Sequence, residues 1–166
     1  MKSNINIILL IVISNFINIA SYGQDYSEEA KEYFSGYLDT ESQMELFTTS
    51  LPTLEECKLI FKNENANIFY EYVETLKIEI ENEELIEKEY FAVCKVESFS
   101  TCDFEKETNY IVGGMYKIKD KFKDKIIFYQ VTYLREQDAV YGVNYNYFVN
   151  IKGRWVFIPK PWHVLG

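Results

Sequence analysis

The side chains on which catalysis and metal binding most often depend are scarce in this sequence. Its 166 residues include one histidine, His163, and three cysteines. A nucleophile–histidine pair or a histidine–metal cluster could form only around His163, which follows Trp162 near the C-terminus and is typical of a tail residue. No two cysteines have the CxxC spacing, and His163 is far from all three in sequence. The sequence therefore predicts no metal site.

Carboxylates remain as possible acid–base groups. Glu136 and Asp138 lie in a predicted turn, and Asp103 and Glu105 follow a cysteine, but no spacing singles out a pair. Gly113-Gly114 precedes a short helical pattern, yet the longer glycine-rich motif that ends in Lys and Ser or Thr is missing, so we expect a tight turn there. The sequence thus predicts no catalytic residue and no cofactor, and an Asp/Glu acid–base pair stays open as an alternative.

A candidate binding surface comes from the β-hairpin predicted around Lys152-Gly153. A two-residue loop places Ile151 opposite Arg154, and alternation then gives a more apolar face that should pack on the helices and include Tyr145 and Tyr147. The opposite face mixes aromatic rings with amides, which suits a ligand, although a half-solvated sheet face is the alternative. The members of this second face are Asn144, Asn146, Phe148, Trp155 and Phe157.

The first 23 residues have the pattern of a secretory signal peptide. Lys2 precedes an apolar run, and Ser21 and Gly23 suit the −3 and −1 positions of a signal-peptidase site. The run is shorter than the ~20 apolar residues that span a bilayer, and no later segment is apolar enough to do so. We therefore expect cleavage near Gly23, export to the periplasm or beyond, and one domain over residues 24–166.

The three cysteines all follow the predicted cleavage site, so they would meet an oxidising environment. Cys94 and Cys102 are nearest in sequence and flank a polar stretch, which makes them the candidate disulfide pair. Cys57 falls on the apolar side of a predicted helix, where a buried thiol packs without reacting.

The charge balance is acidic, with 17 Lys and Arg against 26 Asp and Glu and a net charge of −9. Such a surface repels nucleic acid and anionic lipid, so neither is predicted as a partner. Glutamates gather between Glu74 and Glu89. This cluster indicates a solvated helix face, and the alternative is an acidic patch that covers a basic partner.

Apolar residues at helical spacing predict four helices in the first half of the chain, starting near Ser27, near Asp39 or Thr40, after Thr53 and near Asn65. Thr53 and Glu56 have the spacing of a capping box. Later segments alternate or are rich in β-branched residues and predict strands over 91–99, 126–134, 140–151 and 154–158. The predicted fold class is α+β, with N-terminal helices packed on a curved antiparallel sheet that ends in a three-stranded meander.

This order of elements resembles the cone-shaped α+β folds of the nuclear transport factor 2-like and cystatin-like type. The resemblance is carried by the Glu55-Glu56-Cys57 helix with its long successor, and by the closing run from Tyr145 to Trp162. The chain is also similar to small exported bacterial proteins of no assigned activity. Enzymes of the nuclear transport factor 2-like group place acid–base residues inside the cone, and no matching dyad is found here.

The favoured hypothesis is an exported, non-catalytic module that binds a small molecule or another protein through the concave face of its sheet. One alternative is a cone-fold hydrolase or isomerase with an Asp/Glu acid–base pair. The other is a periplasmic acidic inhibitor or immunity protein. The first alternative requires a carboxyl group with a raised pKa inside a cavity.

Overall fold

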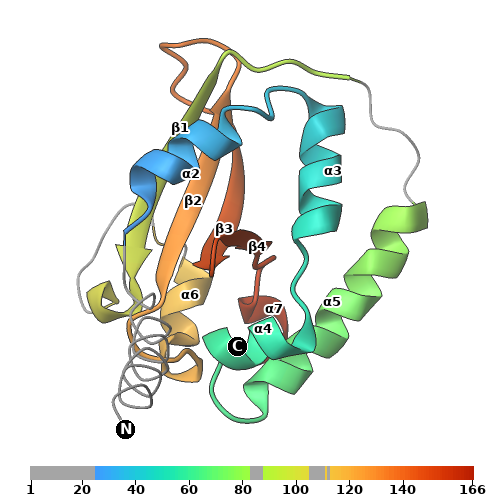
Figure 1. The fold of residues 1–166 in the computed structure, drawn as a ribbon, viewed down its shortest axis with the longest axis vertical. Helices are drawn as coiled ribbons and strands as arrows, with labels where there is room; N and C mark the ends of the chain where they lie inside the picture. Colours follow the sequence, from blue (N-terminus) through green and yellow to red (C-terminus); the bar gives the residue numbers. More distant parts are fainter. Residues whose placement is uncertain (1–24, 83–87, 105–110, 112) are drawn as a thin grey trace, which may run out of the picture.

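The computed structural model describes residues 25–82, 88–104, 111 and 113–166 (Figure 1). The signal peptide predicted over residues 1–23 lies outside this part of the chain. No helix among the described residues is long and apolar enough to cross a membrane.

The fold is α+β, as the sequence predicts, and is built on a four-stranded antiparallel sheet. The strands follow one another in sequence order, so the last three form the predicted meander. The hairpin at Lys152-Gly153 has the predicted register, with Ile151 opposite Arg154 and Phe148 opposite Phe157. Both turn residues have positive φ, 53° at Lys152 and 87° at Gly153, as in the type I′ turn that favours two-residue hairpin loops. The strands are β1 (Val93–Ser100), β2 (Ile127–Leu134), β3 (Val143–Ile151) and β4 (Arg154–Phe157).

Helices cover both faces of this sheet. Helices α2 (Ser27–Phe34) and α3 (Thr40–Ser50) pack on one face, and α2 crosses β1 and β2 in Figure 1. The other face is covered by α4 (Leu54–Ile60), α5 (Asn65–Asn82) and two short helices, α6 (Gly113–Lys117) and α7 (Trp162–Leu165). The sheet therefore separates two apolar cores, which we name the α2–α3 core and the α4–α7 core.

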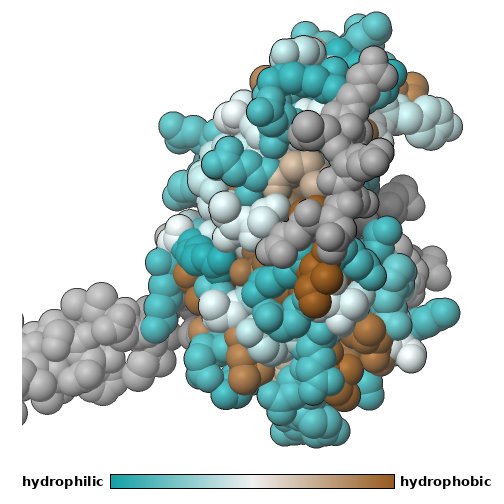
Figure 2. Space-filling model, turned by 90° about the vertical axis from the view of Figure 1, so that its right-hand side faces the viewer, coloured by the Kyte–Doolittle hydropathy of each residue, from teal (hydrophilic) through white to brown (hydrophobic). Residues whose placement is uncertain are grey.

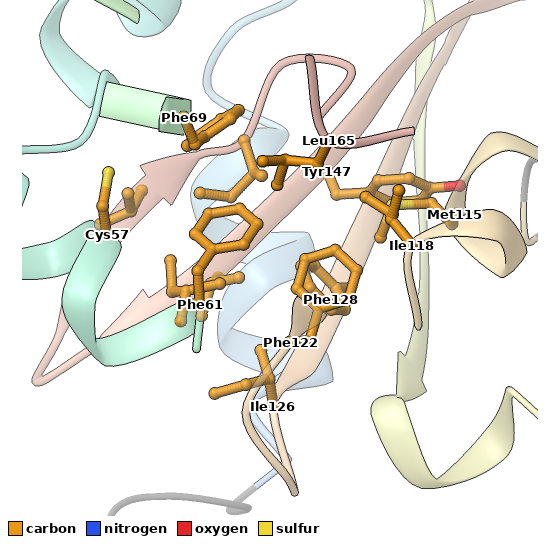
Figure 3. Packing of buried hydrophobic residues seen from close by; sticks show 14 of the residues in the cluster. Cys57, Phe61, Phe69, Met115, Ile118, Phe122, Ile126, Phe128, Tyr147 and Leu165 are labelled. Carbon is orange, nitrogen blue, oxygen red and sulfur yellow. The ribbon is translucent and has the colours of Figure 1, made fainter. Parts of the chain in front are cut away.

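Adjacent residues of β2 and β3 supply large side chains to the two different cores. Tyr147 and Phe128 belong to the α4–α7 core, where they lie close to Phe61, Phe69 and Phe122 (Figure 3). The neighbouring residues Phe148 and Tyr129 belong to the α2–α3 core. Successive strand residues point to opposite faces, so helices on both sides of the sheet bury both members of each of these pairs.

Local hydrogen bonds fix the helix starts that the sequence predicts. The Asp39 carboxylate accepts a hydrogen bond from the Ser42 N–H at 3.1 Å and begins α3. Thr53 and Glu56 form the predicted capping box of α4, in which the Thr53 N–H donates to the Glu56 carboxylate at 2.8 Å. A capped start of this kind typically stabilises a helix by about 1 kcal/mol.

A β-bulge in β3 changes the predicted faces of that strand. Tyr129 pairs with Phe148, whereas Val131 pairs with Tyr145, so two residues of β3 stand opposite one residue of β2. Because a bulge adds one residue, it reverses the alternation on one side of it. Tyr145 consequently packs with the α2–α3 core, and the prediction that it shares a face with Tyr147 was wrong.

The paired glycines at 113 and 114 open a short helix, as predicted, and one of them has a packing role. A Cβ on Gly114 would lie 2.3 Å from Cγ of Trp162, so no side chain fits between α6 and the indole ring. This close approach explains the glycine without an anion.

The predicted disulfide between Cys94 and Cys102 is wrong, because both thiols are free. Cys94 is buried in the α2–α3 core near the start of β1, and Cys102 is exposed just beyond the end of that strand. An extended strand rises about 3.3 Å per residue, so the two ends of β1 lie roughly 20 Å apart. A disulfide requires Cα atoms about 4.4–6.8 Å apart. Cys57 is buried, as predicted, and burial raises the pKa of its thiol to about 12.

Candidate functional site

Two of the predicted ligand-binding residues are part of the α2–α3 core. Phe148 is 0% exposed and Trp155 is 7% exposed. The ring of Phe34 in α2 lies 4.5 Å from that of Phe148 and 5.2 Å from that of Trp155, measured between centroids. The prediction that these two rings form an open binding face was therefore wrong, because α2 and α3 cover the sheet face that they occupy.

The remaining predicted residues have different positions. Asn144 and Phe157 line a pocket at the edge of the sheet. Asn146 lies in β3 next to the bulge, and its side chain is outside the described part of the structure. The sequence thus places two of the five residues at one pocket.

This pocket has a volume of about 260 Å³ and lies between α3, α5 and the sheet edge. That volume is slightly below the roughly 300–1,000 Å³ of pockets that hold drug-sized ligands, so it suits a small group. Figure 2 views the molecule from the side of α3 and α5, where hydrophobic residues are exposed among hydrophilic ones.

One wall of the pocket is a stripe on α5. Tyr72, Leu76 and Ile80 are spaced four residues apart, so they lie on one side of the helix. Phe69 and Val73, on a neighbouring side, are buried in the α4–α7 core. Tyr72 and Ile80 also pack against this core while they line the pocket, so the apolar surface of α5 continues from the core to the pocket.

A second wall comes from α3. Met44 and Phe47 line the pocket at a spacing typical of one helix face, and Leu51, directly after the end of α3, continues this wall. The Phe47 ring lies 4.2 Å from the ring of Tyr145 and 4.9 Å from that of Phe157, between centroids. These three aromatic residues hold one another in place and form a rigid part of the wall.

The polar groups of the sheet wall are fixed by a buried network. The Tyr145 hydroxyl donates to Oε1 of Gln43 at 3.1 Å, and Nε2 of Gln43 donates to the Tyr37 carbonyl at 3.0 Å. Gln43 is fully buried. Burial, and then the charge of Glu89, raise the pKa of Tyr145, so this phenol stays neutral and positions the ring.

Lys160 is the charged residue among the described lining residues. It is exposed, lies between the buried Pro159 and Pro161, and has a positive φ of 38°. Residues that precede proline favour extended backbone, so this conformation is uncommon. The chain leaves β4 at this point, which places the lysine at the pocket.

None of the described carboxyl groups lines this pocket. The pocket therefore contains no described residue for the Asp/Glu acid–base pair of the alternative hypothesis. The carboxyl pKa values that clearly depart from the ordinary range are all lowered, at Asp39, Glu56, Glu74 and Asp120. His163 is exposed on α7, with its ring 5.9 Å from that of Trp162.

The acidic stretch from Glu74 to Glu89 is described only in part, because residues 83–87 lie outside the described chain. Within it, Glu74 pairs with Lys77 at 2.5 Å and Glu89 pairs with Arg135 at 2.7 Å. These pairs neutralise part of the predicted acidic face.

Sequence reasoning missed the helix side of the pocket. Its signal was present in the row Tyr72, Leu76 and Ile80, which continues the apolar stripe beyond the core residues of α5. No sequence signal identifies the opposing residues of α3, because only the tertiary fold brings them next to Tyr72, Leu76 and Ile80.

Compared with models of protein families, with curated proteins and with solved structures, the chain matches none of them. The resemblance to cone-shaped folds therefore stays a prediction.

Proposed function

We propose that the chain is an exported, non-catalytic binding protein that holds an apolar group of its ligand in the pocket between α3, α5 and the sheet edge. The observation that carries this proposal is the apolar lining from two helices and the sheet, with few polar groups to orient a ligand. This combination is typical of binding sites. The signal-peptide pattern of the first 23 residues supports export.

The proposal moves the site from the sheet face to the sheet edge. Phe157 and Asn144 keep the role that the sequence predicts for them, whereas Phe148 and Trp155 support the wall from within the core. Leu76 and Ile80 supply the apolar surface opposite them.

Straight-chain carboxylates test the pocket, with decanoate and octanoate as probes in isothermal titration calorimetry. Each buried methylene contributes about 0.8 kcal/mol, so decanoate should bind up to about 15-fold more tightly than octanoate. Backbone amide shifts in NMR spectra should concentrate in α3, α5 and the N-terminal half of β3. Equal affinity for the two probes, or shifts confined to another surface, would overturn the proposal.

A matched pair of variants on α5 controls for unspecific effects. Leu76 lines the pocket, whereas Ile78 is a large exposed apolar residue on the same helix. Leu76→Gln places an amide in the apolar wall and should weaken decanoate binding by about tenfold or more. Ile78→Gln should leave the affinity within about twofold, because the residue does not line the pocket.

A further inference from the structure

The N-terminal half of β3 has an unpaired side. Residues 143–145 pair with β2 on one side. On the other side, β4 pairs with residues 148–151, and the backbone hydrogen bonds between Tyr147 and Ile158 are the last in that direction. In the part of the chain that the structure describes, no strand continues this pairing along residues 143–146.

This open edge is also a wall of the pocket. Asn144 and Tyr145 belong to the edge and line the pocket, and α3 and α5 form the opposite side. A group that enters therefore lies beside a stretch of β3 that lacks a strand partner on this side in the described chain. Backbone groups that lose water need hydrogen-bond partners, which an alkyl chain does not supply. An extended peptide supplies both the hydrogen bonds and alternating side chains.

Apolar residues are also exposed in the segment that leads into β3. Val140 is 83% exposed and Tyr141 is 89% exposed, just before β3 begins, and Val143 is partly exposed. An added strand could cover this surface. A second copy of the chain is a poor occupant, because each copy carries a net charge of −9 and the two would repel.

Lys160 indicates which end of a peptide would lie at the pocket. It follows Pro159, at the end of the open edge where the chain leaves β4, and lines the pocket beside Phe157. An ammonium at this position is complementary to a terminal carboxylate. A peptide with its carboxyl end here would run parallel to β3.

We propose that the open edge of β3 and the adjoining pocket bind the extended, apolar carboxyl-terminal segment of another protein as an added β-strand, with its terminal carboxylate beside Lys160. This inference rests on the proposed function, because the same pocket takes the peptide side chains. It names the class of partner: a chain with alternating apolar residues and a free carboxyl end.

The test is affinity selection of synthetic hexapeptides with free carboxyl termini on the purified protein. Apolar and small polar residues are randomised at the last positions, and bound peptides are identified by mass. We expect enrichment of alternating apolar sequences. In titrations of the best peptide, N-methylation of alternate amides should weaken binding at least tenfold in one of the two registers, because strand pairing needs these donors. Conversion of the carboxylate to an amide should weaken it about two- to fivefold, and Lys160→Met should remove this difference.

Variants and the decanoate probe separate the two proposals. Val143→Lys places a charge on the open edge and should weaken peptide binding, while decanoate affinity stays within about twofold. Leu76→Gln should weaken both ligands. Decanoate binding without an enriched peptide, or peptide binding that tolerates N-methylation in both registers, would overturn strand addition and leave the pocket. If the wild-type protein binds neither decanoate nor any of the peptides, the proposed function is overturned as well.

Discussion

Arg154 joins the β3–β4 hairpin to the end of α3 and the start of α4, about 100 residues earlier in the sequence, and its removal gives the sharpest test of the fold. Its guanidinium pairs with the Glu56 carboxylate at 2.5 Å and donates to the carbonyls of Thr49 and Leu51 at 3.0 and 3.1 Å. From its position in the β3–β4 hairpin, Arg154 supplies hydrogen-bond donors to carbonyls at the C-terminal end of α3 and to the carboxylate of the α4 capping box.

The expected cost of Arg154→Met follows from these contacts. Two hydrogen bonds to backbone carbonyls contribute about 1 kcal/mol each. The side chain of Glu56 is 15% exposed and that of Arg154 is 40% exposed, so solvent screening limits the ion pair to about 1 kcal/mol. The free energy of unfolding should therefore fall by about 2–3 kcal/mol. Arg154→Lys should recover part of this loss, because a single ammonium keeps the charge but cannot bridge all three acceptors.

The pH dependence of this cost identifies the contribution of Glu56. Burial opposes ionisation of this carboxyl group, but hydrogen bonds from Thr53 and the Arg154 guanidinium outweigh it and lower the pKa. A lowered pKa in the folded state gives stability that is fully present above the unfolded pKa and is lost as the pH falls through the folded pKa. The difference between wild type and Arg154→Met should therefore shrink in acid, below the usual glutamate range.

Urea denaturation followed by circular dichroism measures both quantities. The other arginine of the chain, Arg135, provides a matched control, because it also pairs with a glutamate but is 68% exposed. Arg135→Met should cost less than about 1 kcal/mol. If Arg154→Met were no more costly than Arg135→Met, or if its cost did not change with pH, the proposed role of this contact would be refuted.

Three further predictions concern packing and thiols. Gly114→Ala should destabilise the protein by about 1–3 kcal/mol in thermal unfolding, because its Cβ would overlap the Trp162 ring, whereas Gly36→Ala should be milder, with its nearest atom at 3.3 Å. Iodoacetamide should label only Cys102 in the native protein, since Cys57 and Cys94 are buried, and it should label all three thiols after denaturation. An intact protein mass lower by two hydrogens would indicate a disulfide and contradict the free thiols. Gln130 is buried, and its Oε1 has no hydrogen-bond partner. Gln130→Met should therefore leave the free energy of unfolding unchanged or raise it by up to about 1 kcal/mol in urea denaturation. A large loss of stability would show that this amide is needed.

Local signals in the sequence predicted much of the fold. The Thr53–Glu56 capping box and the Asp39 cap depend on residues three apart, so they can be recognised without the tertiary structure. The hairpin register follows from a two-residue loop, and this part of the face assignment is confirmed. The α5 segment alternates in places like a strand, but its helix-forming residues correctly favoured helix.

Most of the errors depend on contacts between distant segments, and the disulfide error depends on the local geometry of β1. The bulge in β3 has no turn residue to mark it, so alternation was carried too far and Tyr145 was assigned to the wrong face. Phe148 and Trp155 were separated from the core because nothing in the sequence states that α2 and α3 return to that face. Cys94 and Cys102 are close in sequence, but the strand between them is extended. The pocket could be predicted only on its sheet side for the same reason.

The position of Phe157 gives the pocket an effect on the whole molecule. This residue packs against both cores and also lines the pocket, and the other lining residues include members of each core. Substitutions in separate cores should have additive effects on stability, since they share few contacts. A bound ligand would contact Phe157, which both cores share, and its binding energy would resist the loosening of either core. Occupancy of a small edge pocket would thus be reported as slower hydrogen exchange on both sides of the sheet.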